Sequence, residues 1–148
     1  MAVDRSFAKL GARVDDLGIA AADRLAEAEL LFAAGRYSSA VMMGLYALEI
    51  QLKVLICRRL DLDQLPRAFE THDLEGLLVL AGLSRKIKSI KRPRGVEKNW
   101  IELLRSSEEI NDFRYVTKPG WDHAWATKVL GQLRDTPNGV LPWLSKQA

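Results

Sequence analysis

The stretch SSAVMMGLYALEIQLKVLICRRL, residues 38–60, decides the fold of this chain. Read as a helix, it is apolar on most sides, with one stripe at three- and four-residue steps formed by Val41, Leu45, Leu48, Leu52 and Leu55. A helix of this kind is buried in protein, so we expect it at the centre of a bundle. Its few polar residues share one broad face, where Glu49 precedes Lys53 in the favourable i,i+4 order.

The segment before it, residues 17–34, has the period of an amphipathic helix. Its apolar row consists of Leu17, Ala21, Leu25, Ala28 and Phe32. Gly35 follows at the point where a helix end favours a left-handed residue. Since only a short turn separates the two segments, we expect them to form an antiparallel helical hairpin.

Further helical segments follow a linker at residues 62–69. We expect a helix capped by Thr71 and ended by Gly82, a second one from Asn99 to the Pro119-Gly120 stop, and a long one from Trp121. Residues 136–146 can dock as an apolar cover. No strand-like alternation is visible, so the sequence predicts an all-α, up-and-down bundle of four to five main helices.

Length and composition fit a single domain over residues 1–148, with a core at about 17–134. The chain is 48% hydrophobic, which is ample for one packed core. Its longest apolar run, residues 40–48, is about half the length that a spanning helix needs, so we expect no membrane contact. No secretory signal is visible, and a cytoplasmic location is expected. The single Cys57 reads as a small core residue, although the adjacent Arg58 and Arg59 would lower its pKa if it were exposed.

Positive charge is concentrated between residues 85 and 98. Seven basic residues stand there against one acid, whereas the whole chain carries only +3: Arg85, Lys86, Lys88, Lys91, Arg92, Arg94 and Lys98. Such a cluster is either a solvated loop or a patch for phosphate backbones or an acidic partner. No aromatic residue lies between these positions, so base stacking is not indicated.

The spacing of the helical segments, together with several residues, resembles the HEPN domain family of prokaryotic helical bundles. The resemblance is carried by Ala28, Leu31, the Gly35-Arg36-Tyr37 turn, Ala40, Ala47, Glu49, Lys53, His72-Asp73-Leu74, Leu77 and Phe113-Arg114-Tyr115. This family includes RNA-cutting toxins, their partners and defence proteins. The family commonly has a histidine at the position of His72, which looks structural and is expected to bond back to the first hairpin.

The resemblance implies a possible active site at Arg114, but one group is missing. In active HEPN ribonucleases an arginine is followed, after four to six residues, by a histidine, and two protomers together cut RNA without metal. Here those positions hold Pro119, Gly120 and Trp121, none of which can transfer a proton. His123 comes later and lies about 200° around the helix from Trp121, so we expect it to face away from the core.

Three alternatives remain for Arg114. It is a structural cation, either paired with an acid such as Glu49 or placed as a charge at a helix C-terminus; or a contact for a ligand or phosphate together with Tyr115, Glu49 and Lys53; or a catalytic group. No glycine-rich phosphate loop or metal-ligand spacing is present, so no cofactor and no metal are expected. Trp121 and Trp125, one turn apart, either pack in the core or form a dimer surface.

The sequence therefore predicts a HEPN-like protein that binds RNA or a nucleotide and is not expected to be an enzyme. The resemblance implies a homodimer that acts as partner or accessory component of a toxin–antitoxin or antiphage defence system, beside a nucleotidyltransferase partner protein. The Arg114 region would lie in a cleft at the dimer interface, with the basic stretch at its edge. The alternative is a metal-independent endoribonuclease toxin in which His72 or His123 replaces the missing imidazole.

Overall fold

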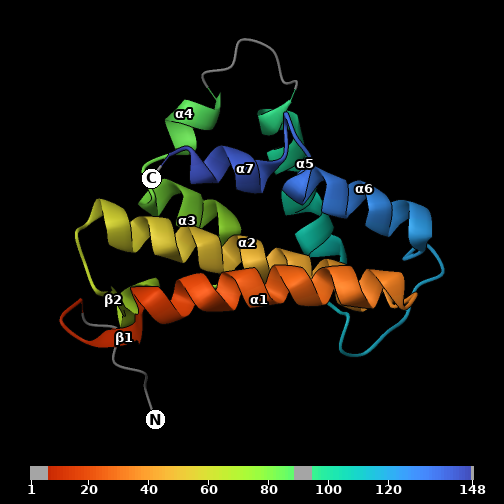
Figure 1. The fold of residues 1–148 in the computed structure, drawn as a ribbon, viewed down its shortest axis with the longest axis horizontal. Helices are drawn as coiled ribbons and strands as arrows, with labels where there is room; N and C mark the ends of the chain where they lie inside the picture. Colours follow the sequence, from red (N-terminus) through yellow and green to blue (C-terminus); the bar gives the residue numbers. More distant parts are fainter. Residues whose placement is uncertain (1–6, 89–94, 148) are drawn as a thin grey trace.

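A long helical hairpin forms one side of the molecule in the computed structural model, which describes residues 7–88 and 95–147. Helix α1 (Val14–Ala33) and helix α2 (Tyr37–Arg59) lie side by side along their length, and the shorter helices lie beyond α2 (Figure 1). The turn between them requires Gly35, whose φ is 76° and whose amide donates to the Phe32 carbonyl. The predicted hairpin is confirmed, and both helices begin within three residues of their expected starts.

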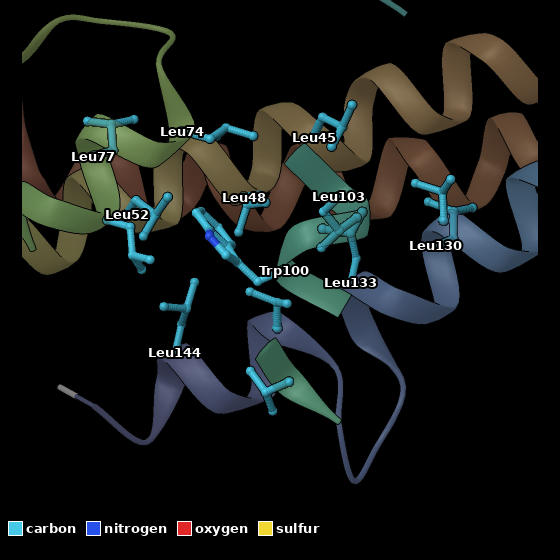
Figure 2. Close-up of a cluster of buried hydrophobic side chains, with 14 of the residues drawn as sticks. Leu45, Leu48, Leu52, Leu74, Leu77, Trp100, Leu103, Leu130, Leu133 and Leu144 are labelled. Carbon is cyan, nitrogen blue, oxygen red and sulfur yellow. The ribbon is translucent and has the colours of Figure 1, made fainter. Parts of the chain in front are cut away.

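Helix α2 is the central element, as its sequence predicts. Its apolar side chains pack against a cluster that surrounds Trp100, where Leu48 and Leu52 meet Leu103 and Leu144 from other helices (Figure 2). By length and composition alone α2 is apolar enough to cross a membrane, since an 18-residue window within it has a mean hydropathy of 1.7. The shorter apolar run in the sequence had not led us to expect this. However, 67% of that window is buried inside the protein, as in the core helix of a helical bundle.

A small sheet replaces part of the expected linker. Strand β1 (Leu10–Arg13) pairs antiparallel with strand β2 (Gln64–Pro66), and a 3-10 turn, η1 (Arg67–Phe69), follows. The expectation of no strand is therefore wrong. The two strands have only four and three residues, too few for an alternating pattern to be visible in the sequence.

Two short helices connect the hairpin to the rest of the chain. Helix α3 (Leu74–Leu80) begins at Asp73, whose carboxylate accepts from the Gly76 amide at 3.1 Å, so the cap is Asp73 and not the predicted Thr71. Helix α4 (Ser84–Lys88) occupies the first part of the basic stretch, before the residues that the structure does not describe. Its one buried side chain is Ile87, which joins the core.

Helix α5 (Val96–Glu109) starts three residues before Asn99 and ends well before Pro119. Residues 110–115 instead form turns, in which the Phe113 amide donates to the Ile110 carbonyl and the Tyr115 amide to the Asp112 carbonyl. Arg114 therefore lies in a turn and not on a helical stripe.

Helix α6 (His123–Arg134) is capped by Asp122, which accepts from the Trp125 amide at 3.0 Å. Helix α7 (Val140–Ser145) buries Val140 and Leu144 against the core, so the expected apolar cover is present. Helices make up 67% of the described residues, and the predicted helical class is confirmed.

Candidate functional site

A cavity of about 460 Å³ opens between α2, the segment before α3 and the turns after α5. It is lined by Met42, Leu45, Tyr46 and Glu49 of α2, by His72 and Leu74, and by Ser107, Ile110, Asn111, Phe113, Arg114 and Tyr115. Three of the four predicted ligand-contact residues thus lie in one cavity. The fourth, Lys53, lies one helical turn from Glu49 on α2.

Glu49 is the centre of the polar network in this cavity. Its Oε2 accepts from Nζ of Lys53 at 3.1 Å, which is the predicted i,i+4 pair, and its Oε1 lies 2.8 Å from Nδ1 of His72. Lys53 is only 8% exposed, and a buried ammonium requires such a partner. The bond from His72 back to the hairpin is also confirmed. Both carboxylate oxygens of Glu49 are therefore occupied.

The Glu49 contact determines the state of the His72 ring. An ionised carboxylate only accepts hydrogen bonds, so Nδ1 is the donor in this pair and Nε2 is left as the free ring nitrogen. The His72 side chain is 89% exposed, so the free nitrogen can reach solvent or a ligand. Glu49 thus positions the imidazole at the entrance of the cavity.

Arg114 does not pair with Glu49, contrary to the structural alternative. It is exposed and makes no ion pair within residues 7–88 and 95–147. Because Lys53 neutralises Glu49, Arg114 supplies the uncompensated charge of the cavity lining. The site is therefore suited to an anion.

Three further residues of the cavity lining, Tyr46, Asn111 and Phe113, were not predicted as site residues. Tyr46 and Asn111 are exposed and Phe113 is half-buried, while the predicted Tyr115 is 83% exposed. Tyr46 could have been found because it lies three residues before Glu49, on the same face of α2. Asn111 lies three residues before Arg114, but its position depends on the turns that follow α5.

The described part of the basic stretch lies away from this cavity. Arg85, Lys86 and Lys88 are exposed on α4, and Lys98 is exposed at the start of α5, whereas the cavity touches the other end of α5 (Figure 1). At a rise of 1.5 Å per residue, Lys98 and Ile110 are about 18 Å apart along the axis of α5. The expected position of this stretch at the edge of the cleft is wrong for these four residues. Lys91, Arg92 and Arg94 lie outside the described residues.

The other histidine packs near the tip of the hairpin. His123 is exposed, but its ring packs against the side chains of the hairpin tip. Its ring centroid lies 5.1 Å from that of Phe32 and 5.5 Å from that of Tyr37. It is not among the residues that line the cavity with Arg114. Trp121 and Trp125 stack at 6.0 Å, with Nζ of Lys118 5.4 Å from the Trp121 ring centroid.

Cys57 is fully buried, and burial raises the pKa of its thiol, so the alternative of a lowered pKa is wrong. Over the part of the chain that the structure describes, no three His, Cys, Asp or Glu side chains are grouped as metal ligands would be.

No family model, no curated protein and no solved structure matches this chain. The resemblance to HEPN domains thus depends on the residues quoted from the sequence.

Proposed function

We propose that this protein is a HEPN-like binding domain whose cavity holds the phosphate and base of an RNA or nucleotide without cutting it. The observation that carries the proposal is that one cavity is lined both by Arg114, which makes no ion pair with any residue that the structure describes, and by the rings of Tyr46, Phe113 and Tyr115. Arginine matches the geometry of a phosphate, and exposed aromatic rings stack on bases. This combination fits a ligand that is anionic at one end and planar at the other.

The same groups explain why the proposed activity is binding. The positions where the family motif has its histidine hold Pro119, Gly120 and Trp121, which cannot act as acid or base. His72 supplies a single imidazole to the cavity, whereas metal-free RNA cleavage needs a base for the attacking hydroxyl and an acid for the leaving oxygen. Arg114 can then hold a phosphate but does not itself move protons.

The wider role follows from the resemblance. We place the protein in the cytoplasm as a homodimeric partner or accessory component of a toxin–antitoxin or antiphage defence system. The neighbouring genes test this role. A nucleotidyltransferase gene beside this one supports the toxin–antitoxin assignment, and a cluster of defence genes supports the effector assignment. The absence of both kinds of neighbouring gene would contradict both assignments.

Binding is tested by fluorescence anisotropy with a labelled single-stranded RNA and with a labelled adenine nucleotide. We expect Arg114→Ala to weaken binding about tenfold or more, because charge-assisted hydrogen bonds contribute about 1.5–3 kcal/mol. Tyr46→Ala should also weaken binding, by the loss of stacking at about 1–3 kcal/mol per base. The matched control is Arg105→Ala, which removes the same charge from an exposed site on α5 that does not line the cavity. Equal affinity of all four proteins would contradict the proposal.

The second candidate is a metal-independent ribonuclease, and one contact favours it. Glu49 holds Nδ1 of His72 at 2.8 Å in the cavity that Arg114 also lines. A carboxylate-oriented imidazole is an effective general base, and an arginine can stabilise the negative charge on the phosphoryl oxygens in the transition state. A second copy of the chain would have to supply the acid.

Incubation with total RNA in the presence of a chelator separates the two candidates. The binding proposal expects intact RNA with the natural protein and with His72→Ala. Cleavage that disappears in both His72→Ala and Arg114→Ala, but persists in His123→Ala, would establish the ribonuclease with His72 as its base.

A further inference from the structure

A second, smaller cleft lies between α5 and α6, which pack against each other (Figure 1). Its volume is about 220 Å³, compared with about 460 Å³ for the Arg114 cavity, and the two share no lining residue. Pockets for drug-sized ligands have roughly 300–1,000 Å³, so this cleft suits a smaller molecule. Its polar lining includes Glu102, Ser106 and Glu109 of α5 and Lys128 and Gln132 of α6, with the ring of Trp125 as an aromatic wall.

Ser106 is a buried polar side chain that lacks a partner in this cleft. It is only 8% exposed, and its hydroxyl makes no hydrogen bond within residues 7–88 and 95–147. The nearby Gln132, 7% exposed, is in contrast satisfied, since its Nε2 donates to Oε2 of Glu102. Buried polar groups in proteins are generally hydrogen-bonded. Because the Ser106 oxygen is not fully enclosed by protein, it is open to a group that enters the cleft.

The cleft also offers one available charge of each sign. Glu109 is exposed, and its carboxylate forms no ion pair with any residue that the structure describes. Nζ of Lys128 lies 3.9 Å from Oε2 of Glu102, which is too far for a hydrogen bond, so the donors of this ammonium remain available. A molecule that complements both groups carries one positive and one negative charge.

The distance between these two groups indicates the length of such a molecule. Glu102 and Glu109 are seven residues apart, or about 10 Å along the axis of α5, and the Lys128 ammonium lies at the Glu102 end. A charge-assisted hydrogen bond spans about 2.8 Å, so a contact at each end leaves about 5 Å between the charges of the ligand. An extended ω-amino acid with a few methylene groups has this separation, whereas the two charges of an α-amino acid lie closer together.

Trp125 gives the cleft a surface for the apolar part of this molecule. Its ring is half-buried and stacks on that of Trp121, with the centroids 6.0 Å apart, so the neighbouring ring holds it in place. An indole face packs against methylene groups and attracts an ammonium group. The wall therefore suits a short aliphatic chain that ends in an amine.

We propose that the cleft between α5 and α6 binds a small ω-amino acid. Its ammonium group pairs with Glu109 beside the Trp125 ring, and its carboxylate accepts from Lys128 and from the Ser106 hydroxyl. Gln132 keeps Glu102 hydrogen-bonded, so Glu102 does not compete for the ligand ammonium. Since this cleft and the Arg114 cavity have separate linings, the proposal does not depend on the binding of RNA or a nucleotide.

Titration with 4-aminobutyrate, followed by the indole N–H signals in NMR spectra of the full chain, tests the ligand class. The Trp125 signal, assigned with Trp125→Phe, should shift saturably with a dissociation constant in the millimolar range, as expected for so few ligand atoms. The signal of Trp143 on α7, which does not line the cleft, is the internal control. Butylamine and butyrate each lack one charge and should bind about tenfold more weakly or less. Equal binding of either analogue, or no saturable shift with 4-aminobutyrate, would overturn the proposal.

Two variants test the assigned contacts. Glu109→Gln keeps the size of the side chain and should weaken 4-aminobutyrate about tenfold while leaving the weak binding of butyrate unchanged, because only the ammonium contact is lost. The matched control is Glu108→Gln, the same change at an exposed α5 site outside the cleft. Ser106→Ala should weaken the ligand without lowering the unfolding temperature of the free protein, because this hydroxyl has no partner there. Equal affinities of the Glu109 and Glu108 variants, or a Ser106→Ala protein that loses stability but not affinity, would contradict the proposed contacts.

Discussion

The two helices of the hairpin have nearly equal lengths but opposite surroundings. Helix α2 buries 12 of its 23 residues, whereas α1 buries 2 of its 20. The sequence already separates them, because residues 17–34 have the pattern of an amphipathic helix whereas residues 38–60 are apolar on most sides. The difference is that α2 has packed neighbours on several sides, while α1 packs mainly on α2. Helix α2 therefore carries stability and positions the cavity, whereas most residues of α1 keep contact with solvent.

The largest expected effect is on core packing. Leu48→Ala in α2 removes a side chain with no exposure and should lower the free energy of unfolding by about 2–5 kcal/mol. Leu30→Ala in α1 makes the same chemical change at an exposed site and should change the monomer by less than about 0.5 kcal/mol. Urea unfolding in dilute solution, followed by circular dichroism, measures both. Similar losses in the two variants would show that α1 is as enclosed as α2.

The next effect concerns the one ion pair that α2 buries. Glu49→Ala leaves Lys53 without its acceptor and should lower the free energy of unfolding by about 2 kcal/mol, less than the roughly 3–5 kcal/mol of a fully buried pair because Glu49 keeps some exposure. The double variant Glu49→Leu with Lys53→Met should recover much of that loss. If the single and double variants are equally unstable, the packing of α2 and not the charge pair is responsible.

The polar network shows how far the sequence could predict this site. The Glu49 to Lys53 pair follows from helical spacing, and the return of His72 to the hairpin was expected from the resemblance; both contacts are present. The cavity itself could not be predicted, since Glu49, His72 and Arg114 come from three segments and meet only after α5 ends at Glu109. The sequence suggested a helix that continues to the Pro119-Gly120 stop, whereas α5 ends at Glu109 and turns that carry Arg114 follow it.

Short and non-local elements account for the other differences. Strands β1 and β2 lie more than 50 residues apart in the chain, and three or four residues carry too little pattern to predict their pairing. Helix α4 has five residues, which is too short for a helical period to be recognised in the sequence. In contrast, the hairpin was predictable because its contacts lie between adjacent segments and its turn contains Gly35.

Two glycines sharpen the comparison between the helices. A Cβ at Gly18 of α1 would meet no atom within 4 Å, so Gly18→Ala should stabilise the protein by about 0.5–1 kcal/mol through helix propensity. A Cβ at Gly44 of α2 would lie 2.8 Å from Leu133 and 3.0 Å from Leu130 of α6. Gly44→Ala should therefore destabilise by about 1 kcal/mol, because overpacking outweighs the gain in propensity. Thermal unfolding of both variants measures the difference, and two changes of the same sign would contradict it.

The smallest effect is the reactivity of the thiol on the buried side of α2. Burial raises the pKa of Cys57 above its ordinary value of 9.0, because an ionised thiolate would lose its hydration. In dilute solution we expect a thiol reagent to modify Ala26→Cys on α1 rapidly and Cys57 only as fast as the protein opens.

The sign of the pH effect follows from the same burial. Below the unfolded pKa of about 9.0 both states keep the proton and Cys57 contributes nothing to the pH dependence. As the pH rises beyond that value, the thiol ionises first in the unfolded state, which lowers the free energy of that state. The free energy of unfolding therefore falls until the pH passes the pKa of the folded state. The stability difference between the natural protein and Cys57→Ala should therefore be constant at neutral pH and shrink above the ordinary thiol pKa. A difference that stays flat across that range, with Cys57 as reactive as the cysteine on α1, would mean that this side of α2 is not closed to water.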